Sequence, residues 1–403
     1  MRKTTVLLMS IYAAGAAIPA FAEDGASEVE LKPIIDIRAR YEGVDQDNAL
    51  RDADAVTARI RAGLEVKVSD FSFLAEGEGT LAVIDNYNST TNGNAGIFSV
   101  VADPENIELN RLQLQYAGIS KTKVTVGRQR INIGDQRFVG AVAWRQNEQT
   151  FDALRVQSSA LGPVSVDASY IISQRTIFGV DAGPRQSFDM DTFLVDLGLN
   201  LGPVKLTGFA HFIDQDQPAR FAFASKTFGI RAVGKFNLGK AKLTAKASYA
   251  NQSDYQTNPA DYDVDYIAVE LAGAASGFGA KVGYEELGAD GAGNRFQTPF
   301  ATLHKFNGWA DLFLSTPATG LRDYYGGVSY APGNIGPFKG VKTQLVYHKF
   351  EADVGGADYG DEINASLGFK LGKVGVLFKY ADFNSDGFAV DTTKFWLQFG
   401  WKY

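Results

Sequence analysis

The chain has 403 residues, a formal net charge of −7 and no cysteine. An acidic balance speaks against nucleic acid as a partner, and a chain without cysteine has neither a disulfide framework nor a thiolate site. It carries 28 Phe, 17 Tyr and 4 Trp, yet only its N-terminus holds a long apolar run, whereas a protein built from membrane helices shows several runs of about twenty residues.

Residues 1–22 predict a signal peptide. Arg2 and Lys3 precede an apolar stretch that ends in Ala20-Phe21-Ala22 before Glu23, which is the basic start, apolar core and small-residue cleavage site of a secretory signal. The stretch is short for a bilayer span and Pro19 interrupts its end, which speaks against an anchoring helix. Removing it takes the formal charge from −7 to −9. We expect residues 23–403 to form a single domain.

Alternation with a period of two runs through the rest of the chain. Beginning with Ile35 and Ile37 against Asp36 and Arg38, apolar side chains take one face and polar ones the other, which is the pattern of β-strands. Splitting the chain at its Gly, Pro, Asn and Asp clusters predicts about eighteen strands, near 31–42, 56–68, 71–84, 107–117, 122–131, 149–159, 164–175, 191–201, 203–214, 226–236, 241–253, 262–273, 278–288, 321–331, 340–350, 361–371, 373–383 and 391–403.

Long and short connections alternate between these strands. The odd ones, such as 85–106, 132–148 and 289–320, are mostly long, and the even ones, such as 69–70 and 201–203, are tight turns. Long outer loops and short periplasmic turns are typical of outer-membrane barrels, whereas a soluble β-sandwich has no such asymmetry. We therefore expect an all-β fold: a transmembrane, antiparallel, up-and-down β-barrel in the outer membrane of a Gram-negative bacterium, in contact with lipid and lipopolysaccharide.

Charged side chains on the strand faces opposite the apolar ones predict a wet lumen, because unpaired charge in hydrocarbon is costly. Such charges bias which solutes pass. The predicted pore-lining or solute-binding residues are Arg38, Arg40, Arg59, Arg61, Glu65, Glu76, Arg128, Arg130, Arg137, Trp144, Arg145, Arg155, Arg231, Lys242, Lys246 and Lys342. Two alternatives stay open: ion pairs that fill a silent lumen, and arginines that anchor an inward-folded loop through Asp135, Glu148 or Asp152.

The loop 289–320 holds apolar residues at near-helical spacing between Pro299 and Pro317. This spacing predicts a short amphipathic helix. Its candidate constriction residues are Leu303, His304, Phe306 and Trp309. A free outer loop would expose these apolar groups, which favours a constriction in the barrel mouth over a cap on its rim.

Catalysis and metal binding find little support. His211, His304 and His348 lie apart, with no Ser, Asp or Glu beside them in a recognisable nucleophile motif. A barrel hydrolase acting on lipid or peptide through His348 and Glu351 or Asp353 is the alternative. The acidic outer loops do not follow the spacing of a calcium-binding EF-hand. We expect no enzyme activity, no metal site and no cofactor.

Three stretches carry a family resemblance: VTVGRQRINIGDQRFVG at 124–140, WRQNEQTFD at 144–152 and FQTPFATLHKFNGWAD at 296–311. The chain resembles the alginate-export family of outer-membrane barrels. This resemblance implies a monomeric barrel of about eighteen strands that passes saccharides, with Arg and Lys attracting uronate carboxylates. Alginate exporters carry a long periplasmic turn, whereas the longest one here spans about 331–339. We therefore expect a porin for passive diffusion of hydrophilic, anionic or saccharide-like solutes, with a dedicated polysaccharide exporter as the alternative.

Overall fold

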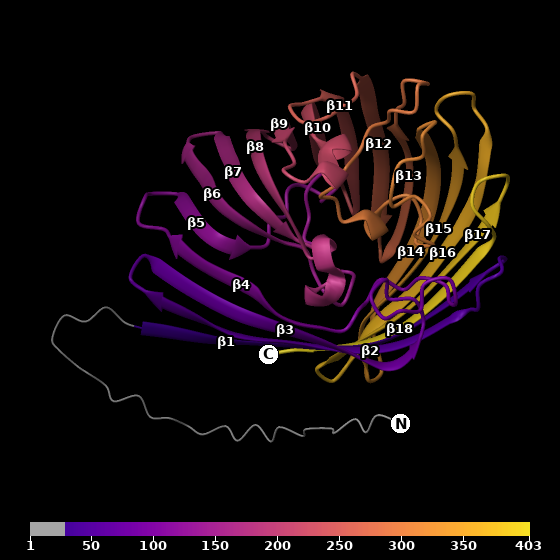
Figure 1. The fold of residues 1–403 in the computed structure, drawn as a ribbon. Helices are drawn as coiled ribbons and strands as arrows, with labels where there is room; N and C mark the ends of the chain where they lie inside the picture. Colours follow the sequence, from indigo (N-terminus) through magenta and orange to yellow (C-terminus); the bar gives the residue numbers. More distant parts are fainter. Residues whose placement is uncertain (1–28) are drawn as a thin grey trace.

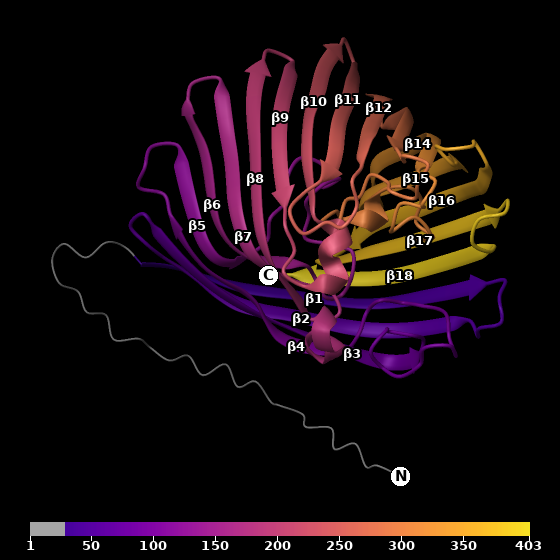
Figure 2. The ribbon, with the colours of Figure 1, turned by 45° about the horizontal axis from the view of Figure 1, so that its top comes forward.

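The computed structural model describes residues 29–403, and the predicted signal peptide lies outside this range. Within it, eighteen antiparallel strands form one sheet that closes on itself, because β1 pairs with both β2 and β18. Every other pairing joins neighbours in the chain, so the up-and-down order is confirmed. Figures 1 and 2 show the strands tilting around the wall, with several loop segments drawn inside it.

The strands agree closely with the predicted ones. They are β1 Val29–Gln46, β2 Ala53–Val68, β3 Phe71–Asn86, β4 Asn106–Tyr116, β5 Thr122–Gln129, β6 Thr150–Leu161, β7 Val164–Arg175, β8 Ser187–Leu201, β9 Val204–Ile213, β10 Ser225–Leu238, β11 Ala241–Asp254, β12 Asp263–Ala275, β13 Phe278–Leu287, β14 Leu321–Ile335, β15 Phe338–Glu351, β16 Asp358–Leu371, β17 Val374–Ser385 and β18 Thr392–Lys402. Three short 3₁₀ turns accompany them: η1 Val180–Arg185, η2 Pro218–Phe223 and η3 Leu303–Lys305.

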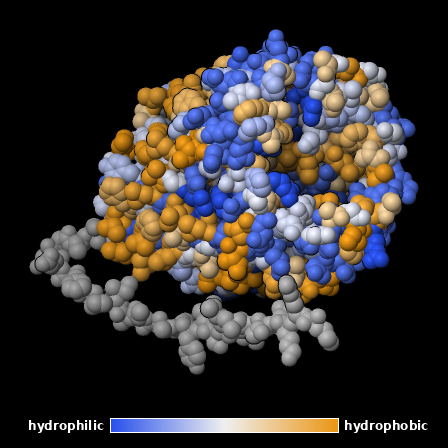
Figure 3. Space-filling view, viewed as in Figure 1, coloured by the Kyte–Doolittle hydropathy of each residue, from blue (hydrophilic) through white to orange (hydrophobic). Residues whose placement is uncertain are grey.

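The two faces of the sheet divide as the alternation predicts. Ile60 and Phe399 point outward and are 43% and 44% exposed, whereas Arg59, next to Ile60 in the chain, is 1% exposed inside the barrel. Apolar side chains cover much of the wall at the left of Figure 3. An apolar outer face and a polar inner face suit a wall between lipid and water. In the described residues, no helix is long and apolar enough to cross a membrane.

The two ends of the barrel differ in their connections. At one end, turns of two residues, such as 162–163 and 372–373, join the strands, and 117–121 is the longest turn in the described chain. The other end carries long loops, including 87–105, 130–149 and 288–320. The predicted nine-residue connection at 331–339 is wrong, because β14 continues to Ile335 and β15 begins at Phe338, with a shift in register at Gly333 absorbing the irregularity.

Two of the long loops fold into the barrel. Phe138 of one and Phe296, Phe300 and Phe313 of the other are buried in an apolar cluster with inward side chains of the wall. The predicted amphipathic helix in the second loop is wrong. Only η3 forms, because Asn307, Gly308 and Asp311 have φ angles of 53°, 82° and 62°, which an α-helix does not accommodate.

Candidate functional site

The two inward loops, 130–149 and 288–320, form one unit, which we name the loop pair. Val139 and Phe300 make a parallel bridge, and the Gly140 amide donates to the Phe300 carbonyl at 2.8 Å. The side-chain amide of Gln149 donates to the same carbonyl at 3.1 Å, and Thr302 Oγ1 accepts from the backbone amide of Val142 at 3.2 Å. Backbone and side-chain hydrogen bonds therefore both join the two loops.

Arginines of β1 and β2 hold the loop pair against the wall. Arg38 donates to the carbonyls of Ala143, Trp144 and Arg145, at 3.1, 2.9 and 3.1 Å. Arg61 pairs with Glu148 at 3.0 Å and also with Glu78. Arg40 pairs with buried Asp103, and Arg59 with Asp36. All four arginines lie inside the barrel. Arg38, Arg40 and Arg61 bind loop residues, whereas Arg59 of β2 pairs with Asp36 of β1.

The loop arginines are paired as well. Arg137 donates through Nε to Glu285 at 2.7 Å and through Nη2 to Asn307 Oδ1 at 3.0 Å. Arg145 pairs with Glu42 at 3.2 Å and with Asp311 at 2.7 Å, so it joins the first strand to the second loop. Arg130 pairs with Glu148 and with Glu76, which Arg111 also holds.

The prediction for Arg128 is wrong. Its partners in register are Leu112 and Asp152, and Leu112 faces outward with 41% exposure. Arg128 therefore lies on the outer face, where it binds Asp152 through both Nε and Nη2 at 2.8 Å. Sequence reasoning grouped it with Arg130 because both lie in one arginine-rich run. Within β5, however, Arg128 shares the outward face with Val126, and Arg130 lies beyond the end of the strand.

The remaining predicted residues lie on inward positions of the wall, nearer the turn end of the barrel. Arg155 pairs with Asp167 at 2.6 Å, Arg231 with Asp196 at 2.7 Å and Lys246 with Glu270 at 2.7 Å. Glu65 accepts a hydrogen bond from Ser72. Lys242 and Lys342 are exposed near the turn end.

Three indole rings enclose a lysine where the loop pair meets β17 and β18. Lys379 Nζ lies 4.0 Å from the ring centroid of Trp144, 3.7 Å from that of Trp309 and 5.3 Å from that of Trp396. It donates to His304 Nε2 at 2.6 Å, and His304 Nδ1 contacts Asp311 Oδ1 at 2.7 Å. Burial lowers the pKa of His304 to about 3, so its imidazole is neutral near pH 7 and can accept this hydrogen bond.

Of the predicted constriction residues, His304 and Trp309 thus belong to this cluster. His304 also stacks on Trp144, with ring centroids 4.3 Å apart. Phe306 lies under the Arg137 guanidinium, 4.9 Å away. Leu303 borders an outer cavity that is described next.

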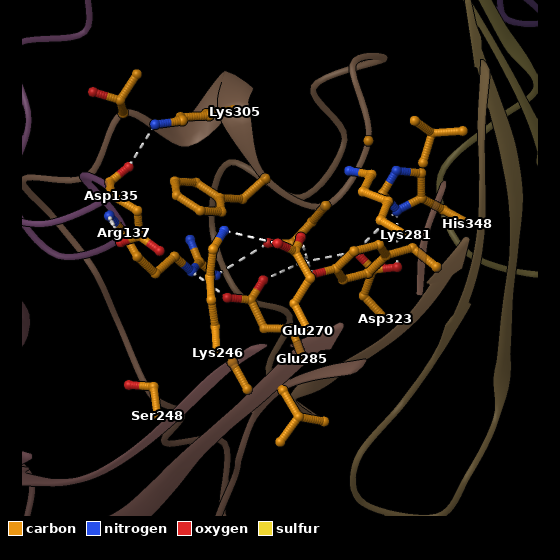
Figure 4. Close-up of a pocket in the computed structure, with 18 of the residues that line it drawn as sticks. Asp135, Arg137, Lys246, Ser248, Glu270, Lys281, Glu285, Lys305, Asp323 and His348 are labelled. Atoms are coloured by element: carbon orange, nitrogen blue, oxygen red, sulfur yellow. Dashed lines mark hydrogen bonds and ion pairs between the residues drawn. The ribbon is translucent and has the colours of Figure 1, made fainter. Parts of the chain in front are cut away.

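Three cavities follow one another along the barrel. The outer cavity, about 320 Å³, lies among the long loops, the middle cavity, about 710 Å³, lies beside the loop pair, and the inner cavity, about 760 Å³, lies near the turns. Outer and middle cavities share Arg137 and His304, and middle and inner cavities share Asp135, Arg231, Val233 and Lys246. In the middle cavity, shown in Figure 4, Arg137, Lys246 and Glu285 converge on the same space. The three cavities therefore adjoin one another beside the loop pair.

Comparison with known proteins agrees with this architecture. Residues 34–175 match the family model described as alginate export. The resemblance to the alginate-export family is confirmed. No curated protein matches the chain significantly.

Solved structures with the same fold are outer-membrane proteins. The Pseudomonas aeruginosa outer membrane protein OpdK is 13% identical, with a TM-score of 0.72 over 93% of this chain and 98% of that one. OpdK with vanillate gives 12% identity and a TM-score of 0.74 over the same shares. Acinetobacter baumannii OccAB4 gives 15% identity and 0.67 over 94% of this chain and 99% of that one. The chain has the fold of these barrels of the Gram-negative outer membrane.

In this barrel, several cavity-lining groups were missed by sequence reasoning. Lys281 and Lys379 border the middle cavity, and Lys123 and Lys205 border the inner one. All four lie on the polar face of strands in which apolar and polar side chains alternate. Applying the inward-face rule to every strand would have found them. Trp396 is a different case. It is fully buried inside the barrel, and its place among Lys394 and Gln398 on the polar face of β18 was the available signal.

Each of the three histidines contacts an aspartate: His211 contacts Asp196, His304 contacts Asp311 and His348 contacts Asp323. The partner of His348 is thus Asp323 and not the predicted Glu351 or Asp353. Among residues 29–403, no serine or threonine hydroxyl is hydrogen-bonded to a histidine, and no group of three His, Asp or Glu residues could hold a metal ion.

Proposed function

We propose that this protein is a passive porin for small hydrophilic organic anions, including acidic sugars. The observation that carries this proposal is a surplus of cationic side chains along the middle and inner cavities. The inner cavity is bordered by the cations Lys121, Lys123, Lys205, Arg231, Lys235 and Lys246 and by the carboxylates Asp135, Asp167 and Asp196. Each of these carboxylates already has an arginine within 4 Å, whereas Lys123, Lys205 and Lys235 have no carboxylate partner in residues 29–403.

The middle cavity repeats this imbalance. Its carboxylates Glu270, Glu285 and Asp323 are paired with Lys246, Arg137 and His348, and its fourth carboxylate, Asp135, is paired with Arg231. Lys281, Lys305 and Lys379 also border the space and have no carboxylate partner in the described chain. Fixed charge in a narrow water column raises the local concentration of counter-ions, here anions.

Lysine is suited to transfer rather than tight capture. An ammonium is a compact and strongly hydrated point charge, so it attracts a carboxylate without holding it in one geometry. Conduction needs binding that is weak and distributed over several sites. Successive lysines from the middle to the inner cavity meet this requirement.

The loop pair bears on solute size. It fills much of the lumen with packed side chains, and the route beside it is a series of separate cavities, which suits small molecules better than a polymer chain. The turn end has only short connections in the described chain, so the long periplasmic turn expected of an alginate exporter has no counterpart there. OpdK, which shares the fold, is known in a structure with the organic acid vanillate.

Reversal potentials in planar bilayers test this proposal. Under a salt gradient the wild-type protein should select chloride over potassium. Lys205→Glu, which reverses a charge at the inner cavity, should move the reversal potential toward the cation side. Lys349→Glu makes the same change in charge at the outer rim, where Lys349 pairs with Asp358, and should leave selectivity near the wild-type value. A cation-selective wild type, or equal effects of the two variants, would contradict an anion-attracting lumen.

A further inference from the structure

The outer cavity combines a cation with several phenyl rings. Its wall includes Phe178, Phe188, Phe223 and Phe313, together with Arg137, Arg145 and Arg220. These residues come from β8, η2 and three of the outer loops. The cavity measures about 320 Å³, the lower end of the range of roughly 300–1,000 Å³ in which small-molecule sites fall.

Arg220 differs from the other two arginines of this cavity. Arg137 and Arg145 are held by Glu285, Glu42 and Asp311. The Arg220 guanidinium instead lies 3.9 Å from the ring centroid of Phe223 and 4.5 Å from that of Phe188. Its Nε is buried without a hydrogen-bond partner, and its side chain forms no ion pair with the described residues.

This environment is unfavourable for an isolated charge. Burial lowers the pKa of Arg220 to about 10, with no nearby carboxylate opposing the shift. The side chain stays charged at neutral pH, so the free energy of its partial desolvation is not offset by an anion of the protein. Contacts with two ring faces offset part of this cost, but the hydrogen-bonding edge of the guanidinium is left for another acceptor.

A carboxylate is the acceptor that fits a guanidinium best, because the two planar groups can form a pair of parallel hydrogen bonds. The phenyl rings around it would pack against an apolar body rather than a hydroxyl-rich one. We propose that the outer cavity is a docking subsite for a monocarboxylate with a compact, ring-sized apolar body, and that Arg220 binds its carboxylate. This inference rests on the proposed function, since it names one class of anion that would enter the route.

The position of the subsite gives it a role in loading. The outer and middle cavities meet at Arg137 and His304, so a solute docked at Arg220 lies against the loop pair. Arg137 is already bound to Glu285 there, and His304 is neutral. Arg220 is therefore the cation of this cavity that is free to bind an incoming carboxylate.

Binding of benzoate to the folded protein in detergent, measured by calorimetry, tests the subsite. Benzoate should bind more tightly than acetate, which has no ring, and than benzyl alcohol, which has no charge. Arg220→Gln should weaken benzoate binding by about tenfold, the size expected for losing hydrogen bonds to a charged group. Arg220→Lys should recover part of the affinity. Arg51→Gln is the matched control, because Arg51 also lies over a phenyl ring, Phe98, but does not border the cavity.

Two results would overturn the subsite: Arg220→Gln binding benzoate like the wild type, or acetate binding as tightly as benzoate. The measurement does not depend on conduction. If benzoate binds through Arg220 but the protein passes no ions, the porin proposal is refuted and the subsite stands. If the channel is anion-selective but Arg220→Gln leaves benzoate binding unchanged, the subsite is refuted and the porin proposal stands.

Discussion

Lys379 is the residue at which the loop pair and the wall meet. Its ammonium contacts the rings of Trp144 and Trp309, one from each loop, and donates to His304. A desolvated contact between a cation and an aromatic ring is worth about 2 kcal/mol. A side chain that reaches both loops from β17 therefore helps to hold them in their inward position.

Replacing Lys379 with Met tests this anchoring. The variant keeps the apolar stem and removes the charge, so the inward position should lose about 2 kcal/mol and trypsin should cut after Lys305, within the second loop, roughly thirtyfold faster. Fragment masses report the cut. Lys342→Met, which changes an inward lysine near the turns, should leave the rate unchanged. Equal rates for wild type and Lys379→Met would show that packing alone holds the loops.

Acid should loosen the same contact through His304. Its folded pKa of about 3 lies below the ordinary value of about 6.5, so a released loop takes up a proton between these pH values and the anchored loop does not. Anchoring therefore weakens as the pH falls from about 6.5 toward 3. Burial opposes the ionisation of Asp311, but His304, Lys394 and Arg145 together lower its pKa, so this aspartate stays charged over that window.

Single-channel recordings at pH 7 and pH 4.5 measure this effect. Brief closures or conductance steps should become more frequent at pH 4.5 in the wild type. His304→Gln keeps a neutral side chain at both values and should remove most of the difference. A pH response that persists unchanged in this variant would show that protonation of His304 is not its cause.

At the scale of elements, the second inward loop depends on one glycine. Gly308 has a φ of 82°, and a Cβ atom there would lie 2.3 Å from Glu362 Oε2. Glu362 is fully buried on β16 and accepts hydrogen bonds from the amides of Trp309 and Ala310. The close approach of backbone and carboxylate is possible because position 308 has no side chain.

Gly308→Ala should therefore displace the loop. Strain in the left-handed region adds about 1–2 kcal/mol, and the contact with Glu362 adds to it, so channel conductance should rise and become noisier. Gly293→Ala is a control in the same loop: its φ is 100°, but a Cβ there meets nothing within 4 Å. Equal conductance changes in the two variants would assign the effect to backbone strain and not to the Glu362 contact.

The strands were predictable and the loop pair was not, for a physical reason. Alternation is local, so Arg59 inside and Ile60 outside can be read from their neighbours in the chain. The path of 288–320 depends on left-handed residues such as Asn307 and on partners such as Glu362, which lie far away in sequence. The apolar residues of this loop are buried against several different neighbours. Their periodic spacing was misread as one face of a helix.

Pairing of the inward charges was left open as an alternative. Arg59 and Arg61 were predicted to line the pore, and each is bound to a carboxylate of another segment, Asp36 and Glu148. Strand register and loop position determine which inward charges are paired with a carboxylate and which stay unpaired. The available ones, such as Lys205 and Lys281, were on the predicted face but could not be ranked above the paired ones.

At the scale of the whole molecule, the fold requires a closed wall with lipid outside and water inside. Two neighbouring residues of β15 test this requirement. Leu345 is 49% exposed on the outer face, near the middle of the strand, whereas Gln344 borders the middle cavity. A lysine on the lipid face near the bilayer midplane costs about 2–4 kcal/mol, and an inward lysine is solvated by the lumen.

Leu345→Lys should therefore lower the fraction of protein that folds into lipid vesicles and its midpoint in urea, both followed by the heat-dependent shift of the folded barrel in gel electrophoresis. Gln344→Lys should fold like the wild type and make the channel more anion-selective, because it adds a cation beside Lys281 and Lys379. The same substitution one position apart would then give opposite results. If both variants fold equally well, the outer face does not meet hydrocarbon, and the lumen cannot be the route for solutes.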